Sequence, residues 1–258
     1  MSRELLSVLV VFGAVIIFSA VGIGWTLLQQ WWRARQMLTA AERMGFSFDR
    51  GGRSLLQEGI TEVPIFSFVL LRQGEILSLM KDRTGSSPVI ICDYHYWLGS
   101  VGARFDHSQT VFCFDVKQIP LPDFSLQPRS NAAEKKLLKF GLNLARVAKP
   151  LAGGLTRILL DSAISGVNEG VEFGEHPAFT ARYRLSGSDP QKVKSLFGAG
   201  VLEFLGQQEG TLFSVEKSGD WLVIYKKDVL AEPEGLPARL SEARSIRALF
   251  GGSALPPI

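Results

Sequence analysis

A long apolar run near the N-terminus dominates the hydrophobic pattern of the chain. It begins at Leu5, ends at Leu28 and contains no charged side chain. At ~1.5 Å of rise per residue, a helix of this length measures ~36 Å, which exceeds the ~30 Å hydrocarbon core of a bilayer. The run therefore predicts one transmembrane helix whose partner is the lipid bilayer. A cleaved signal peptide is the alternative, but its apolar region usually has only about 7 to 15 residues.

Basic and aromatic residues follow the apolar run. Three arginines lie after it and Arg3 lies before it. Positively charged flanks stay in the cytoplasm, so a single-pass protein with a cytoplasmic C-terminal domain is expected. Tryptophan and arginine are also enriched at membrane interfaces. The expected membrane-interface residues are Trp31, Trp32, Arg33 and Arg35, although the two tryptophans could instead pack on the helix that follows. The helical pattern continues to Met44, and Gly45 suits a helix end.

The middle of the chain predicts an antiparallel β meander. Runs rich in β-branched and aromatic residues occupy 65–71, 76–80, 89–97 and 109–116, and turn residues separate them. If the third and fourth runs form a hairpin around Gly102, Cys92 faces Cys113. In the cytoplasm both cysteines are expected to be free structural thiols, whereas an oxidising compartment could join them. The proline-rich segment 119–131 is expected to be an extended connector along a sheet edge.

Two basic, amphipathic helical pieces are predicted next, over 132–148 and 151–167. They could pack on the sheet, or they could lie on the anionic inner leaflet beside the anchor. After them, 170–173 is expected to be extended and 179–185 to be a strand. A helix is predicted from Asp189 to about Gln207, with its apolar face in the core. Segments 212–217 and 221–227 suit a hairpin, and 237–249 suits a terminal helix.

These elements predict an α+β fold, with an N-terminal transmembrane helix, an antiparallel β meander and a second β-β-α-β-β-α unit. We therefore expect the chain to consist of four regions. They are a transmembrane anchor with a juxtamembrane helix (1–45), an antiparallel β module (46–130), a basic amphipathic helical segment (131–168) and an α+β module (169–258).

Composition narrows the function further. The 258 residues carry a formal net charge of only +3, with charges dispersed along the chain, so nucleic acid is not an expected partner. Two cysteines without a matching cysteine or histidine pair do not form a zinc site, and no nucleotide-binding fingerprint is present. No metal or cofactor is therefore expected.

The candidate chemistry is confined to one predicted hairpin. Asp93, His95 and His107 are the candidate catalytic residues, because a carboxylate beside an imidazole can act as a general base or bind a metal. The competing reading is that these are surface-facing polar residues on a half-exposed strand. The adjacent residues Asp106, His107 and Ser108 include the three residue types of a catalytic triad, but adjacent side chains diverge, so this match is attributed to chance.

Several segments together resemble a family of uncharacterised bacterial membrane-anchored proteins. They are the N-terminal span and the segments AERMGFSF, DYHYW, QTVFCF, PLPDFSLQP, EHPAFTARYRLSG and LEFL. The resemblance implies a single-pass protein of the bacterial inner (cytoplasmic) membrane with no established activity. Segment 131–167 is longer than the short connector expected in that family.

Three functions remain open at this point. The leading hypothesis is a membrane-anchored, non-catalytic cytoplasmic interaction module with an unknown protein partner. The alternatives are a membrane-associated hydrolase and an envelope lipid-handling protein in which segment 132–167 contacts the inner leaflet. The lack of a convergent polar motif favours a protein that is not an enzyme.

Overall fold

The structure is a computed structural model. It describes residues 3–52, 60, 63–66, 74–82, 88–100, 103–129 and 170–251, of which 3–17, 19, 23, 26, 27, 98–100 and 103–105 are described by their backbone alone. The amphipathic segment expected over 131–168 and most of the strand expected over 65–71 lie outside these residues. The described start of that strand, Pro64–Phe66, forms a 3-10 helix (η3) instead.

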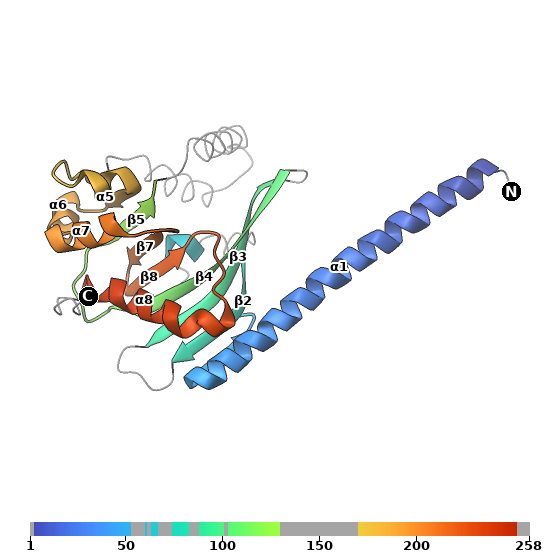
Figure 1. Ribbon diagram of the computed structural model, residues 1–258, viewed down its shortest axis with the longest axis horizontal. Coiled ribbons are helices and arrows are strands. Elements are labelled where there is room, and N and C mark those ends of the chain that lie inside the picture. The colour runs from blue at the N-terminus through green and yellow to red at the C-terminus, as the bar shows by residue number, and fades with distance from the viewer. Residues whose placement is uncertain are drawn as a thin grey trace.

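A single long helix opens the described chain. Helix α1 (Arg3–Met44) has 42 residues and joins the apolar run to the expected juxtamembrane helix without a break. Gly45 follows with a φ of +72°, in the left-handed region that glycine adopts most readily. The predicted helix end is therefore confirmed. The N-terminal part of α1 extends away from the rest of the molecule (Figure 1).

Within the described residues, one eight-stranded antiparallel sheet has the order β1-β2-β3-β4-β8-β7-β5-β6. Strands from predicted regions 46–130 and 169–258 therefore share one sheet, because β4 pairs directly with β8. The α+β class is confirmed. The strands are β1 (Phe46–Arg50), β2 (Gly74–Asp82), β3 (Val89–Ser100), β4 (Ala103–Asp115), β5 (Phe124–Pro128), β6 (Tyr183–Gly187), β7 (Phe213–Ser218) and β8 (Trp221–Lys226).

The β3–β4 hairpin forms as expected, but its register differs by two residues from the prediction. Cys92 pairs with Val111, and Cys113 pairs with Ile90. The centre of the loop lies one residue earlier in the sequence than predicted, because Ser100 pairs with Ala103. A shift of two preserves the face of each side chain. The cysteines are therefore diagonal neighbours on one face, and both are buried free thiols.

Strand β5 corrects the expectation of an edge connector. It pairs with β6 on one side and β7 on the other, so it lies inside the sheet. Pro128 is tolerated because it is the last residue of the strand.

Two helical elements in the last third also differ from the predictions. Pro177 starts helix α5 (Pro177–Arg182), so only the second half of the expected 179–185 strand is extended, as β6. The helix expected over 189–207 is divided into α6 (Pro190–Leu196) and α7 (Ala199–Gln207). The break falls at Phe197, whose side chain is buried, and at Gly198, which precedes α7. The β7–β8 hairpin and the terminal helix α8 (Leu236–Ala248) agree with prediction.

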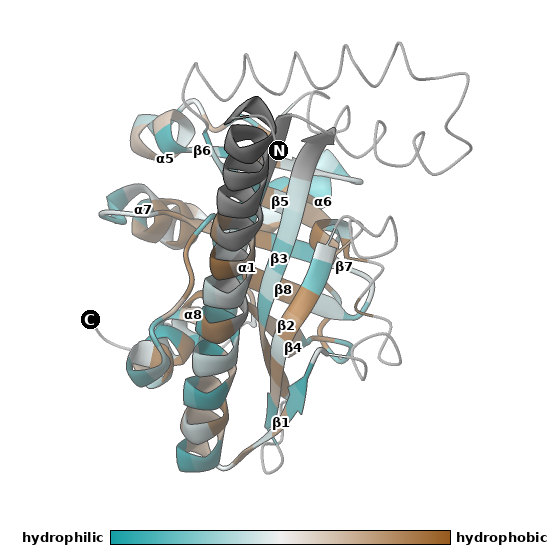
Figure 2. Cartoon of the chain, turned by 90° about the vertical axis from the view of Figure 1, so that its right-hand side faces the viewer, coloured by the Kyte–Doolittle hydropathy of each residue, from teal (hydrophilic) through white to brown (hydrophobic). Residues whose placement is uncertain are grey.

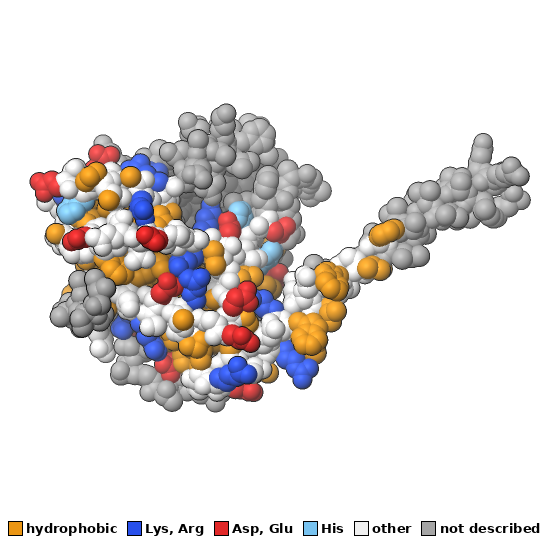
Figure 3. All heavy atoms as spheres, viewed as in Figure 1, with side chains coloured by type: hydrophobic (Ala, Val, Ile, Leu, Met, Phe, Trp, Pro, Cys, Tyr) orange, Lys and Arg blue, Asp and Glu red, His pale blue; other side chains and the backbone are white. Residues whose placement is uncertain are grey.

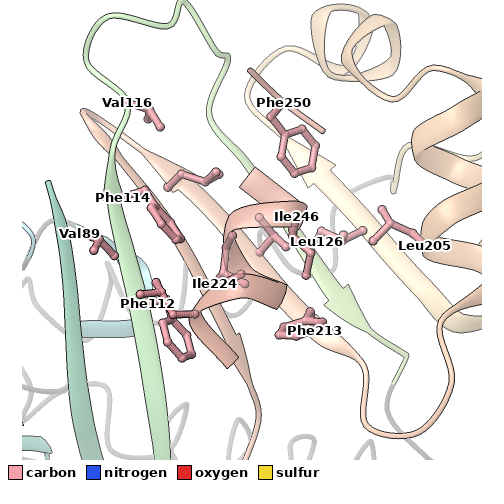
Figure 4. Close-up of a cluster of buried hydrophobic side chains, with 14 of the residues drawn as sticks. Val89, Phe112, Phe114, Val116, Leu126, Leu205, Phe213, Ile224, Ile246 and Phe250 are labelled. Carbon is pink, nitrogen blue, oxygen red and sulfur yellow. The ribbon is translucent and has the colours of Figure 1, made fainter. Parts of the chain in front are cut away.

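Both faces of the sheet are buried over its centre. One face packs against α1, the three short helices and α8, with large side chains such as Phe112, Phe114, Leu126 and Ile246 between them (Figure 4). The other face carries a second cluster that includes both cysteines and residues from η3. At ~25 cal/mol per Å² of apolar surface buried, such two-sided coverage is the main favourable contribution to folding.

Candidate functional site

A buried ion pair joins helix α1 to the centre of the sheet. Arg33 donates from Nε to Asp93 Oδ2 at 2.8 Å and from Nη2 to Oδ1 at 3.2 Å. The Asp93 side chain is only 1% exposed. Thr110, which pairs with Asp93 across the hairpin, donates a further hydrogen bond to it at 2.7 Å. Asp93, which the sequence suggested as a candidate catalytic residue, is therefore the ion-pair partner of Arg33.

The same network reaches the chain that leads to the terminal helix. Arg33 also donates to the carbonyl oxygen of Ala231 at 3.0 Å, and the Ala231 amide donates to Thr110 Oγ1 at 2.8 Å. Three distant parts of the chain therefore share one set of hydrogen bonds. The result is a fixed attachment point for α1.

Apolar packing extends this attachment along the C-terminal part of α1. Met37, Ala40 and Ala41 are buried in the same cluster as Met80 of β2. Met80 pairs with Ile91, two residues before Asp93. Helix α1 therefore contacts the sheet through its packing on β1 and β2 and through the Arg33–Asp93 pair on β3, and together these contacts set its direction relative to the sheet. Figure 2 shows the helix running alongside β2 and β3.

Before Arg33, several of the described side chains of α1 are apolar and exposed. Figure 3 shows hydrophobic side chains along the part of α1 that leads away from the domain, and basic side chains nearer the domain. Within the described part of the chain, the large apolar side chains that are exposed, by at least 38%, are those of Phe18, Val21, Trp25, Leu28, Trp31, Trp32 and Leu38. Contiguous exposed apolar surface marks a site of interaction with another molecule or a membrane.

The expected interface residues occupy different environments. Trp31 and Trp32 are both exposed, and their rings meet edge to face at 5.6 Å. The Arg35 guanidinium lies 5.4 Å from the centre of the Trp31 ring, within the range of a cation–π contact. Arg33 instead pairs with Asp93. Among the described residues, no helix combines the length and the apolar character needed to cross a membrane. The side chains of residues 5–17 lie outside the description.

The two candidate histidines have separate partners. His95 Nδ1 lies 2.8 Å from Ser108 Oγ, and His95 Nε2 lies 3.3 Å from Asp106 Oδ1. His107 Nδ1 lies 2.7 Å from Asp228 Oδ1 and does not join that set. The two-residue correction in register is what places Ser108 opposite His95. In the part of the chain that the structure describes, no group of three potential metal ligands is present.

The contacts of His95 resemble a serine triad in composition but not in geometry. In a triad, the nitrogen Nε2 faces the serine and Nδ1 faces the carboxylate. Here the two nitrogens are exchanged, and the Asp106 side chain is 50% exposed. A half-exposed carboxylate interacts weakly with its partner, because water screens the charge. This arrangement orders the hairpin more readily than it activates Ser108.

A second polar network lies on the opposite face of the sheet, and the sequence pattern did not indicate it. The buried carboxylate of Glu216 accepts hydrogen bonds from the Tyr225 hydroxyl and from Gln127 Nε2, each at 2.8 Å, and from the Ile65 amide at 3.2 Å. Burial raises the pKa of Glu216. Burial and then the Glu216 charge raise the pKa of Tyr225. Because both faces of the sheet are covered, β7 lacks the alternation of polar and apolar residues that would have marked Glu216 as inward-facing.

A surface cavity of ≈ 420 Å³ lies between α8 and the segment that follows β4. Its charged lining residues are Asp115, Lys117, Arg244 and Arg247. The cavity contains none of the candidate residues.

One solved structure has a similar fold. The crystal structure of the mycobacterial trehalose monomycolate transport factor A, TtfA, aligns with 88% of this chain and 97% of its own chain, with a TM-score of 0.51 and 12% sequence identity. No family model matches the chain, and no curated protein matches it. The resemblance to an uncharacterised bacterial family therefore stays a prediction. At this level of identity, the similarity to TtfA concerns the fold.

Proposed function

We propose that this chain is a membrane-associated, non-catalytic factor for lipid transport in a bacterial envelope. The observation that carries the proposal is the extent of the shared fold, which covers nearly all of a transport factor for trehalose monomycolate. This favours the envelope lipid-handling alternative over an interaction module of unspecified purpose. The two readings are compatible, because a transport factor can act by binding a partner protein.

The attachment of α1 fits a factor that works at a membrane. An apolar helix that is held by a buried ion pair and by apolar packing keeps the sheet at a set orientation to the bilayer that the helix enters. In this proposal residues 5–28 cross the bilayer and the domain is cytoplasmic. The positive flank that sets this orientation consists of Arg33, Arg35 and Arg43.

Depletion of the protein in its native bacterium tests the proposal. Long-chain lipids destined for the outer envelope should accumulate in the inner membrane, and extraction followed by mass spectrometry of separated membranes measures this. Unchanged lipid distribution in depleted cells would exclude the transport function. A fluorescent reporter fused after Ile258 tests the cytoplasmic orientation independently.

The hydrolase alternative would have to use the set formed by His95, Asp106 and Ser108, and one variant decides between the two functions. The triple substitution His95→Ala, Asp106→Ala and Ser108→Ala removes that set while leaving the Arg33 attachment in place. A transport factor that lacks catalysis should still restore the lipid distribution in depleted cells. A triple variant that is present at normal abundance and fails to restore transport would favour the hydrolase.

A further inference from the structure

The surface cavity between α8 and the turn that follows β4 has a charged lining that is mainly basic. Its volume of ≈ 420 Å³ falls within the range of about 300 to 1,000 Å³ that is typical of small-molecule sites. Arg244 and Arg247 lie on one side of α8, because residues three apart are neighbours on a helix surface. Lys117 lies in the turn after β4. Three cations from two separate elements therefore border one cavity.

Neighbouring side chains hold the two arginines beside the cavity. The Arg247 guanidinium lies 5.6 Å from the centre of the Phe114 ring, within the range of a cation–π contact. Arg244 Nη2 lies 3.9 Å from Asp82 Oδ2, at the outer limit of an ion pair, and the Arg244 side chain is 54% exposed. Because a guanidinium has five N–H donors, this single long contact leaves most of the Arg244 donors available to a ligand.

Negative groups near the cavity offset only part of this charge. Asp115 is the carboxylate among the described lining residues, and its Oδ1 accepts a hydrogen bond from the Lys117 amide at 2.9 Å. The C-terminal end of α8 carries a partial negative charge, which Arg247 in the last helical turn opposes. The last carbonyl oxygens of this helix accept hydrogen bonds from the amides that follow it. Three cations exceed these negative charges even when Asp82 is counted, so the cavity keeps a positive charge.

The rest of the lining is largely apolar and includes Pro88, Val116, Ile119 and Ala248. Two arginines and a lysine are suited to a phosphate group, since guanidinium donors match phosphate oxygens and lysine adds a point charge. A phosphate group alone occupies only a small part of ≈ 420 Å³. The apolar lining therefore fits the organic part of a phosphorylated molecule.

The cavity lies far from the predicted span. Asp82, which Arg244 approaches, pairs with Phe46 directly after the C-terminal end of α1. The part of α1 between that end and Leu28 is ~24 Å long. Figure 1 shows the N-terminal part of α1 and the C-terminal end of α8 on opposite sides of the molecule. A bilayer that surrounds residues 5–28 would therefore leave the cavity open to the solution.

We infer that the cavity between α8 and the turn after β4 binds a soluble organic phosphate, whose phosphate group contacts Arg244, Arg247 and Lys117. The charge and volume of the cavity carry this inference without the proposed transport function. Only the choice of a soluble ligand over a lipid headgroup rests on the proposed membrane association of α1. Such a site gives the domain a ligand of its own, in addition to any lipid that the protein moves.

Isothermal titration calorimetry of the full-length protein in a non-ionic detergent, with glycerol 3-phosphate as the probe, tests the inference. The double variant Arg244→Gln with Lys117→Gln should weaken binding at least about tenfold, because two charged hydrogen-bond donors are lost. Both side chains are exposed, so their substitution leaves the core intact. Arg239→Gln is the matched control and should bind like the unsubstituted protein, because Arg239 lies on α8 but pairs with Glu242 outside the cavity lining.

Asp115→Asn tests the charge of the cavity in the opposite direction. Asparagine keeps the oxygen that accepts the Lys117 amide and removes one negative charge, so the affinity should rise at least about twofold. A gain of affinity cannot result from misfolding. The inference would be overturned by a lack of saturable binding at millimolar glycerol 3-phosphate. It would also be overturned by equal affinities in the unsubstituted protein, the double variant and Asp115→Asn.

Two further titrations separate the classes of ligand. Succinate should bind more weakly than glycerol 3-phosphate, and equal affinity would overturn the assignment to phosphate. Short-chain phosphatidylglycerol in the same micelles tests the source, because binding of this lipid alone, lost in the double variant, would overturn the soluble ligand in favour of a headgroup. Failure of every probe would overturn the site and leave the proposed function standing. An unchanged lipid distribution in depleted cells would exclude transport but would not affect the site.

Discussion

Arg33 and Asp93 form a two-point ion pair across 60 residues of sequence, with the closest nitrogen–oxygen distance at 2.8 Å. The carboxylate is almost completely buried, while the guanidinium remains partly exposed. The pair therefore holds a helix that is apolar over most of its free length to the centre of a sheet.

Removal of the arginine alone should strongly destabilise the domain. Arg33→Met leaves the Asp93 carboxylate buried without its cation, and breaking such a pair typically costs about 3 to 5 kcal/mol. Urea unfolding of the full-length protein in detergent, followed by circular dichroism, measures the change. The double variant Arg33→Met with Asp93→Asn should recover much of the loss, because no buried charge remains. A double variant that is as unstable as the single one would contradict this account.

Glu216 should make stability depend on pH. Burial raises its pKa in the folded protein above the ordinary value of 4.5. The folded state then binds the proton more tightly than the unfolded state does, so the contribution is complete below pH ~4.5 and is lost as the pH rises through the folded pKa. The free energy of unfolding should therefore fall over this range in the unsubstituted protein. Glu216→Gln should remove the fall, whereas the exposed Glu209→Gln should retain it in urea titrations between pH 4 and 8.

The two cysteines should react only when the protein unfolds. Both are buried, and the pKa of Cys92 is raised by its hydrogen bond with Cys113 and by burial. The thiolate is the reactive species, so a raised pKa and burial both slow modification. Reaction with Ellman's reagent should follow the unfolding rate in water and become immediate in concentrated denaturant. Fast modification of the folded protein would show that this face of the sheet opens.

Phe197 should be a sensitive position in the core. Its ring lies 5.4 Å from those of both Phe124 and Phe250, so it links the break between α6 and α7 to β5 and to the end of the terminal helix. Truncation of such a side chain typically costs about 3 to 5 kcal/mol. Phe197→Ala should lower the free energy of unfolding by this amount, and Phe197→Leu should lower it by less. Equal losses would indicate that the aromatic ring is not closely packed.

The elements that could be predicted from sequence are those whose signals are local. The continuous helix up to Met44, the glycine that ends it, the β7–β8 hairpin and the terminal helix all follow from periodicity and capping residues. The placement of β5 between β6 and β7 could not be predicted in the same way. Its proline-rich sequence is unfavourable for a central strand, and its two partners lie more than 50 residues away.

In the candidate site, too, the residue types could be predicted from the sequence, but their partners could not. Asp93, His95 and His107 were identified by residue type, but their partners depend on the register of β3 with β4 and on the position of α1. The predicted pairing of Cys92 with Cys113 puts Phe112 opposite Asp93. The actual register differs by two residues, so Thr110 is the partner of Asp93 instead. The role of Arg33 could not be predicted either, because the pattern of charges around the apolar run suits a membrane flank equally well.

The pairing of β4 with β8 has a consequence for synthesis of the protein. Strand β4 is complete at Asp115, but its partner begins only at Trp221, about a hundred residues later. At a ribosomal rate of about 5 to 20 residues per second, β4 remains an open edge for about 5 to 20 s while α1 is already outside the ribosome. Open edges are sites of aberrant pairing between chains. Early delivery of α1 to a membrane would keep nascent chains apart during that interval and so protect the half-built sheet from aggregation.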